Sequence, residues 1–480
     1  MSTESTIGAG NVSEGTGTGR EHRLAGRLGA GAIIFMIMAA AAPLTTVSAT
    51  VPVAILSGNG PAYPIMYVVA AVVLAFFAVG FTAMTPHVKS AGAFYSYITE
   101  GVGRRWGLAA AFLALLTYSA VQVAVHAFMG VVLHDFVLSF GGPSIPWWLF
   151  SALSVLVVGV LGYRNIEVSG KVLGVVLVAE VLICLVFAVA VTVRGGGPEG
   201  LSTAMFQPHQ ILSGSPALAL MFAVSGFLGF EAAAVYRDEA RNPDKTIPRA
   251  TYGALAVIGG FYALVAWAII SAWGDNGAVE RAQTDSATML LDAGKRFIGT
   301  FGYEVMQYLL IGSVFACILS FHNVIARYIF RLANTGAMPA KAGLSHPTHR
   351  SPHIASVSQS VSAAALLAIC VVFGLDPITQ VFTWLVGIAT IGVMLLMLGT
   401  CVAILMFFRH NKVDNRRWNT VIAPGLGCVG LGVTTAITAK NLPLLMGSAT
   451  LGWIVVVLLV LTIGAGFLVA ALRPRANTPD

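Results

Sequence analysis

The segment at residues 225–244 reads SGFLGFEAAAVYRDEARNPD, and its first half is apolar enough for a membrane although it contains a carboxylate. Gly226 and Gly229 stand on either side of Phe227 and shortly before Glu231. A glycine costs about 1 kcal/mol relative to alanine inside a helix, so two glycines close together favour a break. The pattern predicts a helix that is interrupted inside the membrane, beside a buried acid.

The whole chain is equally apolar. It has 480 residues, of which 57% are hydrophobic and only 10% are charged, with a mean hydropathy of +0.83. Soluble proteins carry roughly 25% charged residues, and a helix needs about 20 apolar residues to cross a bilayer. We predict an all-α polytopic membrane protein with about twelve transmembrane helices, at 28–57, 63–83, 106–138, 147–163, 167–193, 215–238, 250–273, 303–334, 354–374, 378–408, 419–438 and 448–472.

The net charge of +7 does not indicate a nucleic-acid partner, because the basic residues follow the predicted loops. With an even number of spans, one side of the membrane carries 22 of the 27 Lys and Arg. The other side has the remaining five, which are Arg194, Arg281, Lys295, Arg296 and Lys440. This asymmetry is typical of the positive-inside rule. It predicts a multi-pass protein of the cell (plasma) membrane, in contact with lipid, with both termini cytoplasmic.

The N-terminal segment shows no sign of a soluble domain, and the cysteines show no sign of a cofactor site. Residues 1–23 lack the charged-then-apolar order of a cleavable signal, and we predict a disordered cytoplasmic tail. The cysteines all fall in predicted spans without metal-ligand or redox spacing, which favours a role as apolar packing residues; they are Cys184, Cys317, Cys370, Cys401 and Cys428. We expect no cofactor and no metal, and the sequence does not indicate an oligomeric state.

The first predicted span contains Pro43 near its middle, in the run AAAAPLTT. Proline removes a backbone donor and clashes with the carbonyl four residues earlier, so the turn from Ala39 to Pro43 should open. Thr45 and Thr46 follow directly, with hydroxyl groups that can serve the freed backbone. We therefore predict a second interrupted helix.

The two interrupted spans are the first and the sixth, five helices apart. This spacing predicts two five-helix repeats of opposite orientation, at 24–195 and 196–410, followed by two more helices within 411–480. Irregular backbone is tolerated at membrane depth where it is buried in protein or lines a cavity, and broken helices at matching positions point to a transporter's binding site. The alternative is that Pro43 only kinks its helix and the glycines only permit close packing.

Broken helices present backbone dipoles to a bound molecule. The N-terminus of a half-helix attracts a carboxylate, and free carbonyl groups at a C-terminus attract an ammonium, so a zwitterionic amino acid suits both. Phe227 or Phe230 would then cover the ligand as a gate. The predicted substrate contacts are Ala41, Ala42, Thr45 and Thr46 in the first span, Ser225, Gly226, Phe227 and Gly229 in the sixth, and Gln122 in the third.

Two acids, Glu180 and Glu231, lie well inside predicted spans. An ionisable group at membrane depth costs several kcal/mol unless it is paired, neutralised or facing water, so both are candidates for proton coupling. Alternatively, Glu231 caps a half-helix and Glu180 makes a structural hydrogen bond to a neighbouring helix. His126 and His322 are also within spans, where a packing role is the more common one and a proton relay is the alternative.

At this point the sequence resembles the amino acid–polyamine–organocation (APC) superfamily of permeases. The most specific match is SGFLGFEAAAVYRDEARNPDKTIPRAT at 225–251, which is similar to that family's sixth helix and following cytoplasmic loop. SAGAFYSYITEGVGRRWG at 90–107 and NVIARYIFRLANTGAMP at 323–339 are similar to the segments before helix three and at the end of helix eight. The resemblance covers about residues 25–410.

The resemblance implies a LeuT-like five-plus-five inverted repeat and a secondary transporter that works by alternating access. Many members have a Gly-Ser-Gly break in helix one, where this chain has AAAAPLTT. Some members carry a helix-five lysine thought to replace a sodium ion, and Glu180 falls near that site with the opposite charge. The resemblance therefore implies protons as the coupling ion.

Three functional hypotheses follow. The first is amino-acid uptake, with a neutral substrate because the predicted pocket contains no acid except Glu231 and no base. The second is an exchanger that swaps an amino acid for an amine. The third is a membrane enzyme, which the absence of His-Glu-x-x-His and Gly-x-Ser-x-Gly motifs disfavours. A channel is disfavoured because the chain has no repeated filter sequence.

Overall fold

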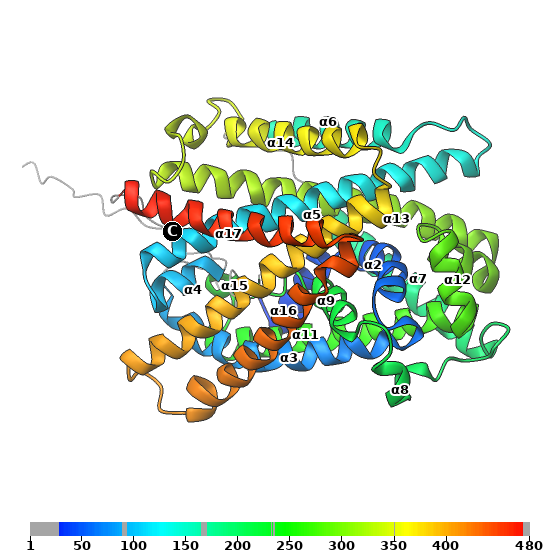
Figure 1. The fold of residues 1–480 in the computed structure, drawn as a ribbon, viewed down its shortest axis with the longest axis horizontal. Coiled ribbons are helices and arrows are strands. Elements are labelled where there is room, and N and C mark those ends of the chain that lie inside the picture. Colours follow the sequence, from blue (N-terminus) through cyan, green and yellow to red (C-terminus); the bar gives the residue numbers. More distant parts are fainter. Residues whose placement is uncertain are drawn as a thin grey trace, which may run out of the picture.

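The computed structural model describes residues 28–88, 94–164, 170–231, 233, 236–349 and 351–473 (Figure 1). The predicted tail at 1–23 lies outside these residues. The described chain is helical and contains no β-strand beyond two isolated bridges. The helices of eight or more residues are α1 Ala30–Ala40, α2 Pro43–Ser57, α3 Pro64–Met84, α4 Phe94–Gly101, α5 Arg104–Ser139, α6 Trp147–Tyr163, α7 Gly170–Val193, α9 Pro216–Ser225, α11 Pro243–Trp273, α12 Asp275–Thr284, α13 Met289–Asn334, α14 His353–Val372, α15 Thr383–His410, α16 Ala423–Met446 and α17 Ala449–Leu472.

The helices confirm the prediction of a polytopic membrane protein. Among the described residues, nine helices are long and apolar enough to cross a bilayer, and the bent pair α1 and α2 raises this number to ten if it counts as one span. Helices α6 and α9 are apolar but have only 17 and 10 residues. The count of twelve spans, the inverted repeat and the three-part division of the chain stay predictions.

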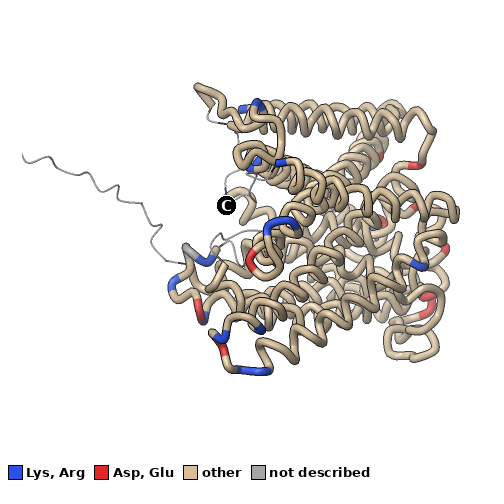
Figure 2. Tube along the Cα trace, turned by 60° about the vertical axis from the view of Figure 1, so that its left-hand side comes forward, with Lys and Arg blue, Asp and Glu red and all other residues tan. Residues whose placement is uncertain are grey.

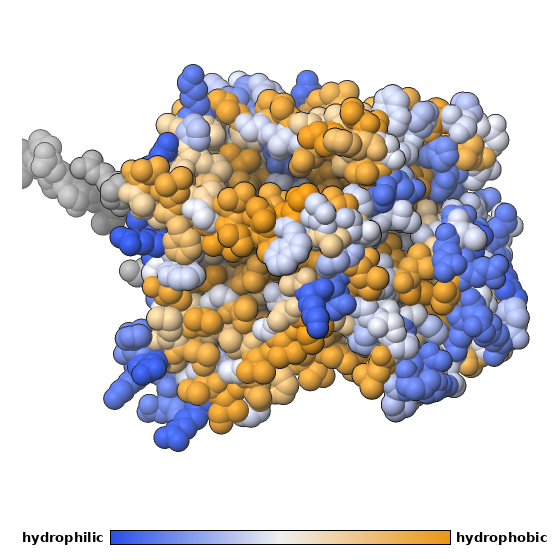
Figure 3. All heavy atoms as spheres, in the orientation of Figure 1, coloured by the Kyte–Doolittle hydropathy of each residue, from blue (hydrophilic) through white to orange (hydrophobic). Residues whose placement is uncertain are grey.

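Polar and apolar side chains are segregated along the long axis of the molecule. In Figure 3 the hydrophobic colours cover the middle, and the hydrophilic residues gather toward the two ends. In Figure 2 most of the described Lys and Arg lie toward one end, on the left in that view. Such an arrangement suits an apolar belt in lipid between two aqueous faces.

The opposite end of the molecule, on the right in Figure 1, carries α12 and the start of α13. Within α13, Gly299 has φ 78° and ψ −178°, so two helices meet at a kink there. Helix α12 packs against α2. This end is therefore built from short helices that lie beside α2, the second half of the broken first span.

Both predicted interruptions are present. Helix α1 ends at Ala40 and α2 begins at Pro43, with a bend of 50° between them. Helix α9 ends at Ser225, and turns follow as far as Glu231. After that point Ala233 is helical and a short 3-10 helix, η4, spans Tyr236–Glu239, while residues 232, 234 and 235 lie outside the described residues.

Candidate functional site

The interruption between α1 and α2 centres on Ala42, which has a left-handed φ of 44°. It is the one non-glycine residue with positive φ among the described residues, and this conformation costs roughly 1–2 kcal/mol. Pro43 favours the interruption because it has no N–H to donate, and it is the first residue of α2. Two hydroxyl groups hold the opened turn by donating to the carbonyl of Ala41, from Thr46 Oγ1 at 2.8 Å and from the Tyr262 hydroxyl of α11 at 3.2 Å.

Glu180 of α7 caps the beginning of α2 from outside that helix. Its Oε2 accepts the backbone N–H of Leu44 at 3.2 Å and the hydroxyl of Ser313, from α13, at 3.0 Å. The hydroxyl of Thr45 donates in turn to Ser313 Oγ at 2.9 Å. The side chain of Glu180 is buried. Because a helix N-terminus is partly positive, the carboxylate stabilises the α2 terminus and links three helices.

The second interruption is held mainly by its own residues. The amides of Gly226, Phe227 and Leu228 each donate to the carbonyl three residues earlier, at 3.1, 3.0 and 3.2 Å. Gly229 then adopts a φ of +98°, which an L-residue rarely takes. Glu231 folds back on this turn and accepts the Gly229 N–H at 3.0 Å.

One contact ties Glu231 to another helix. The Tyr118 hydroxyl of α5 donates to Glu231 Oε1 at 3.2 Å. The carboxylate therefore has a local backbone partner and one partner from a neighbouring span. This arrangement matches the capping role that the sequence left open, although the capped amide lies before Glu231 and not in a following half-helix.

The two interruptions meet. A Cβ atom placed on Gly229 would lie 3.6 Å from the Cβ of Ala40. Next to this contact is a cavity of about 60 Å³, roughly the volume of two liquid water molecules. Its walls come from α1, α2, α5, α13, α15, the end of α9 with the turn after it, and the π-helix η6 Pro377–Phe382. The lining residues are Ala40, Ala41, Thr45, Thr46, Ala49, Thr50, Val121, Val125, Ser225, Leu228, Cys317, Phe321, Phe382 and Val386.

Four of the predicted substrate residues line this cavity, namely Ala41, Thr45, Thr46 and Ser225. Gly229 does not line it, although it makes the contact with Ala40 that brings the breaks together. Ala42 is buried just behind the lining. Hydroxyl groups and opened backbone are thus concentrated at one point, surrounded by apolar side chains.

Gln122, Gly226 and Phe227 lie outside the cavity lining. Gln122 accepts a short hydrogen bond from the amide of Gln359, so its side chain points toward α14 and not into the cavity. A Cβ on Gly226 would meet the ring of Tyr67 at 3.0 Å, which shows that this glycine permits close packing.

Phe227 packs toward α11 beside Gly259, and Phe230 packs edge-to-face on Phe77 with ring centroids 5.9 Å apart. Neither ring covers the cavity. The aromatic side chains that do line it are Phe321 and Phe382. The prediction that Phe227 or Phe230 lies over a ligand therefore does not match this arrangement.

The two membrane histidines have packing partners. His126 Nδ1 lies 2.6 Å from Ser154 Oγ on α6, and His322 Nε2 lies 2.8 Å from Ser356 Oγ on α14. Neither lines the cavity. Their hydrogen bonds join α5 to α6 and α13 to α14, as the packing interpretation expects.

The sequence reasoning missed one wall of the cavity. Ser313, Cys317 and Phe321 are four residues apart on α13, so they share one helical face. Ser313 reaches Glu180, and the other two line the cavity. In the sequence, a small polar residue followed at four-residue intervals by a thiol and an aromatic residue could have indicated this cavity-lining face of the helix.

The cavity lining contains no carboxylate, no imidazole and no cation. Across the part of the chain that the structure describes, no group of three or more His, Cys, Asp or Glu is arranged to hold a metal ion. The chemistry available at the site is therefore hydrogen bonding from hydroxyl and backbone groups, backed by one buried acid, Glu180.

A family model described as "Amino acid permease" matches residues 32–462. The chain is 24% identical over 295 residues to the serine/threonine exchanger SteT of Bacillus subtilis, covering 59% of this chain and 63% of the relative. It is 24% identical over 307 residues to a probable GABA permease of Pseudomonas aeruginosa, covering 61% and 62% of the two chains.

A third relative is the branched-chain amino acid permease BcaP of Bacillus subtilis. The identity is 24% over 317 residues, and the match covers 62% of this chain and 65% of the relative. In all three cases the matched region spans less than two thirds of the relative's own length. The names of these relatives refer to different amino acids.

Proposed function

The chain belongs to the amino acid permease family, within the APC superfamily, and on that premise we propose that it is a secondary transporter of amino acids that works by alternating access. The observation that carries the proposal is the meeting of two helix interruptions at one cavity. Irregular backbone at this depth is stable only where it is buried or lines a cavity. The family is one of transporters, so we do not expect enzymatic activity.

The opened backbone suits the charged ends of an amino acid. In our proposal the substrate carboxylate lies at the N-terminus of α2, where the helix dipole is positive. It takes the Leu44 N–H when Glu180 is protonated, and the hydroxyl groups of Thr45 and Thr46 turn to it from Ser313 and the Ala41 carbonyl. The ammonium lies toward the C-terminal end of α9, near Ser225. The carbonyl of Ala41 already accepts two hydroxyl groups, so it is not among the ammonium ligands we propose.

We propose a neutral side chain for the substrate. The cavity walls beyond the backbone interruptions are apolar, with Val121, Val125, Phe321 and Phe382 facing it. A charged side chain would be desolvated there without a partner.

We propose protons as the coupling ion and Glu180 as the group that binds them. When the Glu180 carboxylate is charged, it holds the Leu44 N–H and the Ser313 hydroxyl. Protonation removes the charge and weakens both hydrogen bonds, since bonds to an ionised acceptor are roughly twice as strong. The start of α2 is then held less tightly by α7, which links proton binding to the helix that contacts substrate.

The experiment that tests this function begins with the purified protein and a thermal-shift screen against the common amino acids and amines. The amino acid with the largest stabilisation is then supplied to proteoliposomes with and without an inward proton gradient. We expect accumulation above the external concentration only with the gradient. Uptake that never exceeds equilibration under either condition would contradict proton-coupled transport.

The second candidate is exchange of one amino acid, or its amine, for another. The name of one relative, a serine/threonine exchanger, favours this candidate. Both modes use the same site, but exchange needs substrate on the far side of the membrane and no gradient. Counterflow into preloaded proteoliposomes at equal pH, with no uptake into empty ones, would support exchange over proton symport.

We also propose a plasma-membrane location with both termini in the cytoplasm. The support is the uneven division of Lys and Arg between the two sets of loops. On this orientation α12 and the kink at Gly299 face the outside. Labelling of single cysteines placed in α12 and in the loop after α15, with an impermeant reagent on whole cells, checks the orientation.

A further inference from the structure

The helices α6 and α14 lie side by side at one edge of the molecule, at the top in Figure 1. Between them is a groove of about 720 Å³. Its floor and walls include the small residues Ala152, Gly159 and Ala364, and large exposed side chains such as Leu156 and Val361 form its rims. The groove is therefore a trough in the membrane-facing surface, and it is separate from the cavity at the interrupted helices.

The groove runs the length of α6. Trp147 and Trp148 line it at the beginning of that helix, and Tyr163 lines it at the end. Seventeen residues of α-helix span about 25 Å, close to the thickness of the hydrocarbon layer. Trp and Tyr favour the two membrane interfaces. The trough thus reaches from one interface to the other.

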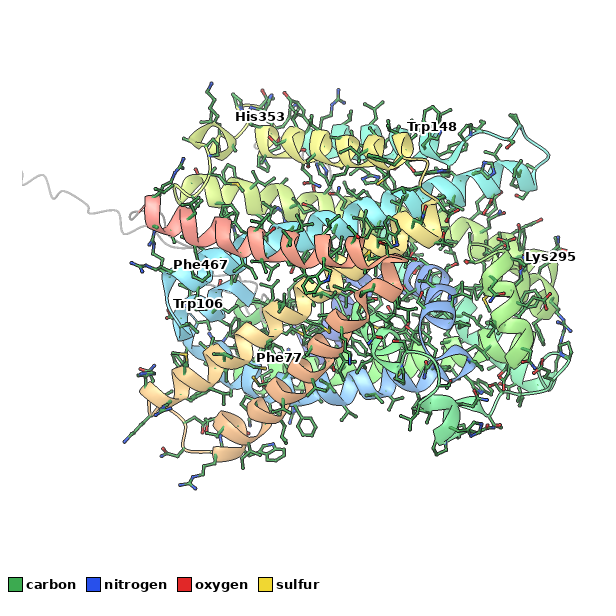
Figure 4. All side chains as sticks on the ribbon, viewed as in Figure 1. Phe77, Trp106, Trp148, Lys295, His353 and Phe467 are labelled. Atoms are coloured by element: carbon green, nitrogen blue, oxygen red, sulfur yellow. The ribbon has the colours of Figure 1, made fainter. Side chains whose placement is uncertain are left out.

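At the Tyr163 end the groove meets a cluster of histidines. The Tyr163 ring lies edge-on to His346, His349 and His353, with centroid distances of 5.4, 6.3 and 6.0 Å. Figure 4 shows His353 and Trp148 toward opposite ends of this layer. The loop is anchored to the helix because Ser351 Oγ donates to the Tyr163 carbonyl at 2.6 Å.

This cluster has hydrogen-bonding capacity that the described protein does not use. His346 Nδ1 accepts the amides of Thr348 and His349 at 3.2 Å each, so its ring proton is on Nε2 and is available to a ligand. The Nδ1 atom of His353 is buried and has no hydrogen-bond partner among the described residues. Buried polar atoms in folded proteins nearly always have a hydrogen-bond partner, so a ligand that bonds to this ring nitrogen would complete its hydrogen bonding.

Basic residues gather around the same end, and Glu167, three residues after Arg164, lies outside the described residues. Arg164 follows Tyr163 directly and is exposed. The loop sequence from 335 to 353 contains Lys341, Arg350 and the three histidines, and has no Asp or Glu. Basic groups at a membrane interface favour anionic head groups by about 1 kcal/mol each.

We propose that this groove is a binding site for one anionic phospholipid, with its acyl chains in the α6–α14 trough and its phosphate beside Arg164 and the histidine cluster. The shape argues for acyl chains over a second copy of this chain. A symmetric dimer would place the same trough against itself, and two concave surfaces leave a void. Lipid acyl chains are narrow enough to fill the groove, and the basic residues at its end complement the negative charge of the phosphate.

The test uses the full chain in mild detergent and native mass spectrometry, with phosphatidylglycerol or phosphatidylcholine of identical acyl chains as the probes. We expect the unmodified protein to retain one phosphatidylglycerol with at least about fivefold preference over phosphatidylcholine, equivalent to ~1 kcal/mol. Ala364→Trp fills the groove and should abolish this retained lipid. Ala365→Trp is the matched control, because Ala365 is also exposed on α14 but does not line the groove.

The head-group contacts are tested with substitutions of surface residues, which we expect to leave folding intact. The double variant Arg164→Gln with His349→Gln should bind both lipids about equally, a loss of the fivefold preference. Arg409→Gln, at the exposed end of α15, should keep that preference. Equal lipid retention by Ala364→Trp and Ala365→Trp would overturn the proposal. So would a native dimer that Ala364→Trp dissociates, because the occupant would then be a second copy.

Discussion

The two interrupted helices solve the same structural problem with different partners. Around Ala42 the opened backbone is held by other helices, through Glu180 of α7 and Tyr262 of α11. Around Gly229 it is held chiefly by its own turn and by Glu231, two residues later. The first interruption is therefore a junction between helices, whereas the second is largely a local motif.

This difference leads us to propose separate roles for the two buried acids. Glu180 connects three helices, so a change in its charge alters how α2 is attached to the rest of the molecule. Glu231 accepts from Gly229 in its own turn and from one hydroxyl group, so an uncharged amide can replace most of what it does. The comparison predicts that substitutions at the first interruption have larger effects on coupling.

The largest effect is expected for Glu180→Gln. The amide oxygen still accepts from the α2 terminus, but the side chain can no longer bind and release a proton. In proteoliposomes with an inward proton gradient we expect the accumulation ratio to fall to about 1, because no coupling free energy connects the gradient to the substrate. Thermal stabilisation by the substrate should persist.

Counterflow is the control for this variant. If Glu180→Gln exchanges preloaded substrate but does not accumulate it, the protein is folded and the loss is specific to coupling. Accumulation equal to that of the unmodified protein would refute the role of Glu180.

A smaller effect is expected for Ser313→Ala. This change removes one donor to Glu180 and the acceptor of the Thr45 hydroxyl, which costs roughly 1 kcal/mol per hydrogen bond. We expect a shift in the pH at which gradient-driven uptake is half-maximal, with uptake retained. An unchanged pH profile would mean that Ser313 does not influence the acid.

Tyr262→Phe tests the other tertiary support of the first interruption. The Ala41 carbonyl keeps the hydroxyl of Thr46 as a partner, so the expected loss of stability is about 1 kcal/mol. A drop in the melting temperature in detergent measures it. Tyr328→Phe is the control, because it removes a buried hydroxyl that has no hydrogen-bond partner among the described residues, and we expect it to leave the melting temperature unchanged. A drop no larger than experimental error for Tyr262→Phe would contradict the comparison.

The smallest effect is expected for Glu231→Gln. The amide oxygen can accept the Gly229 N–H, and the amide NH2 can donate to the Tyr118 hydroxyl oxygen, so transport should stay within about twofold of the unmodified rate, or ~0.4 kcal/mol. Initial rates of uptake measure it. A loss as complete as that of Glu180→Gln would show that both acids take part in coupling.

The positions of both interruptions could be predicted from sequence because their causes are local. Proline lacks an N–H wherever it stands, and Gly229 takes a φ that other residues avoid. The partners of the first interruption could not be predicted in the same way. Ser313 and Tyr262 come from helices whose rotation is fixed only by packing.

Gln122 shows the same limit. It lies in the third predicted span, and the sequence suggested it as a substrate contact. In the structure Val121 and Val125 line the cavity, while Gln122 pairs with Gln359 on α14. In a membrane helix the lipid-facing and core-facing residues are both apolar, so hydropathy does not reveal which face meets a cavity.

The central claim is that the cavity between the two interruptions binds the substrate, and Cys317 offers a direct test because it lines that cavity. A variant keeps Cys317 and replaces the other four cysteines, and a matched variant keeps only Cys428, which lies outside the lining. Both are labelled with a small methanethiosulfonate, with and without the amino acid found in the thermal-shift screen. We predict that the amino acid slows labelling of Cys317 and not of Cys428; equal labelling rates of Cys317 in both conditions would contradict the claim.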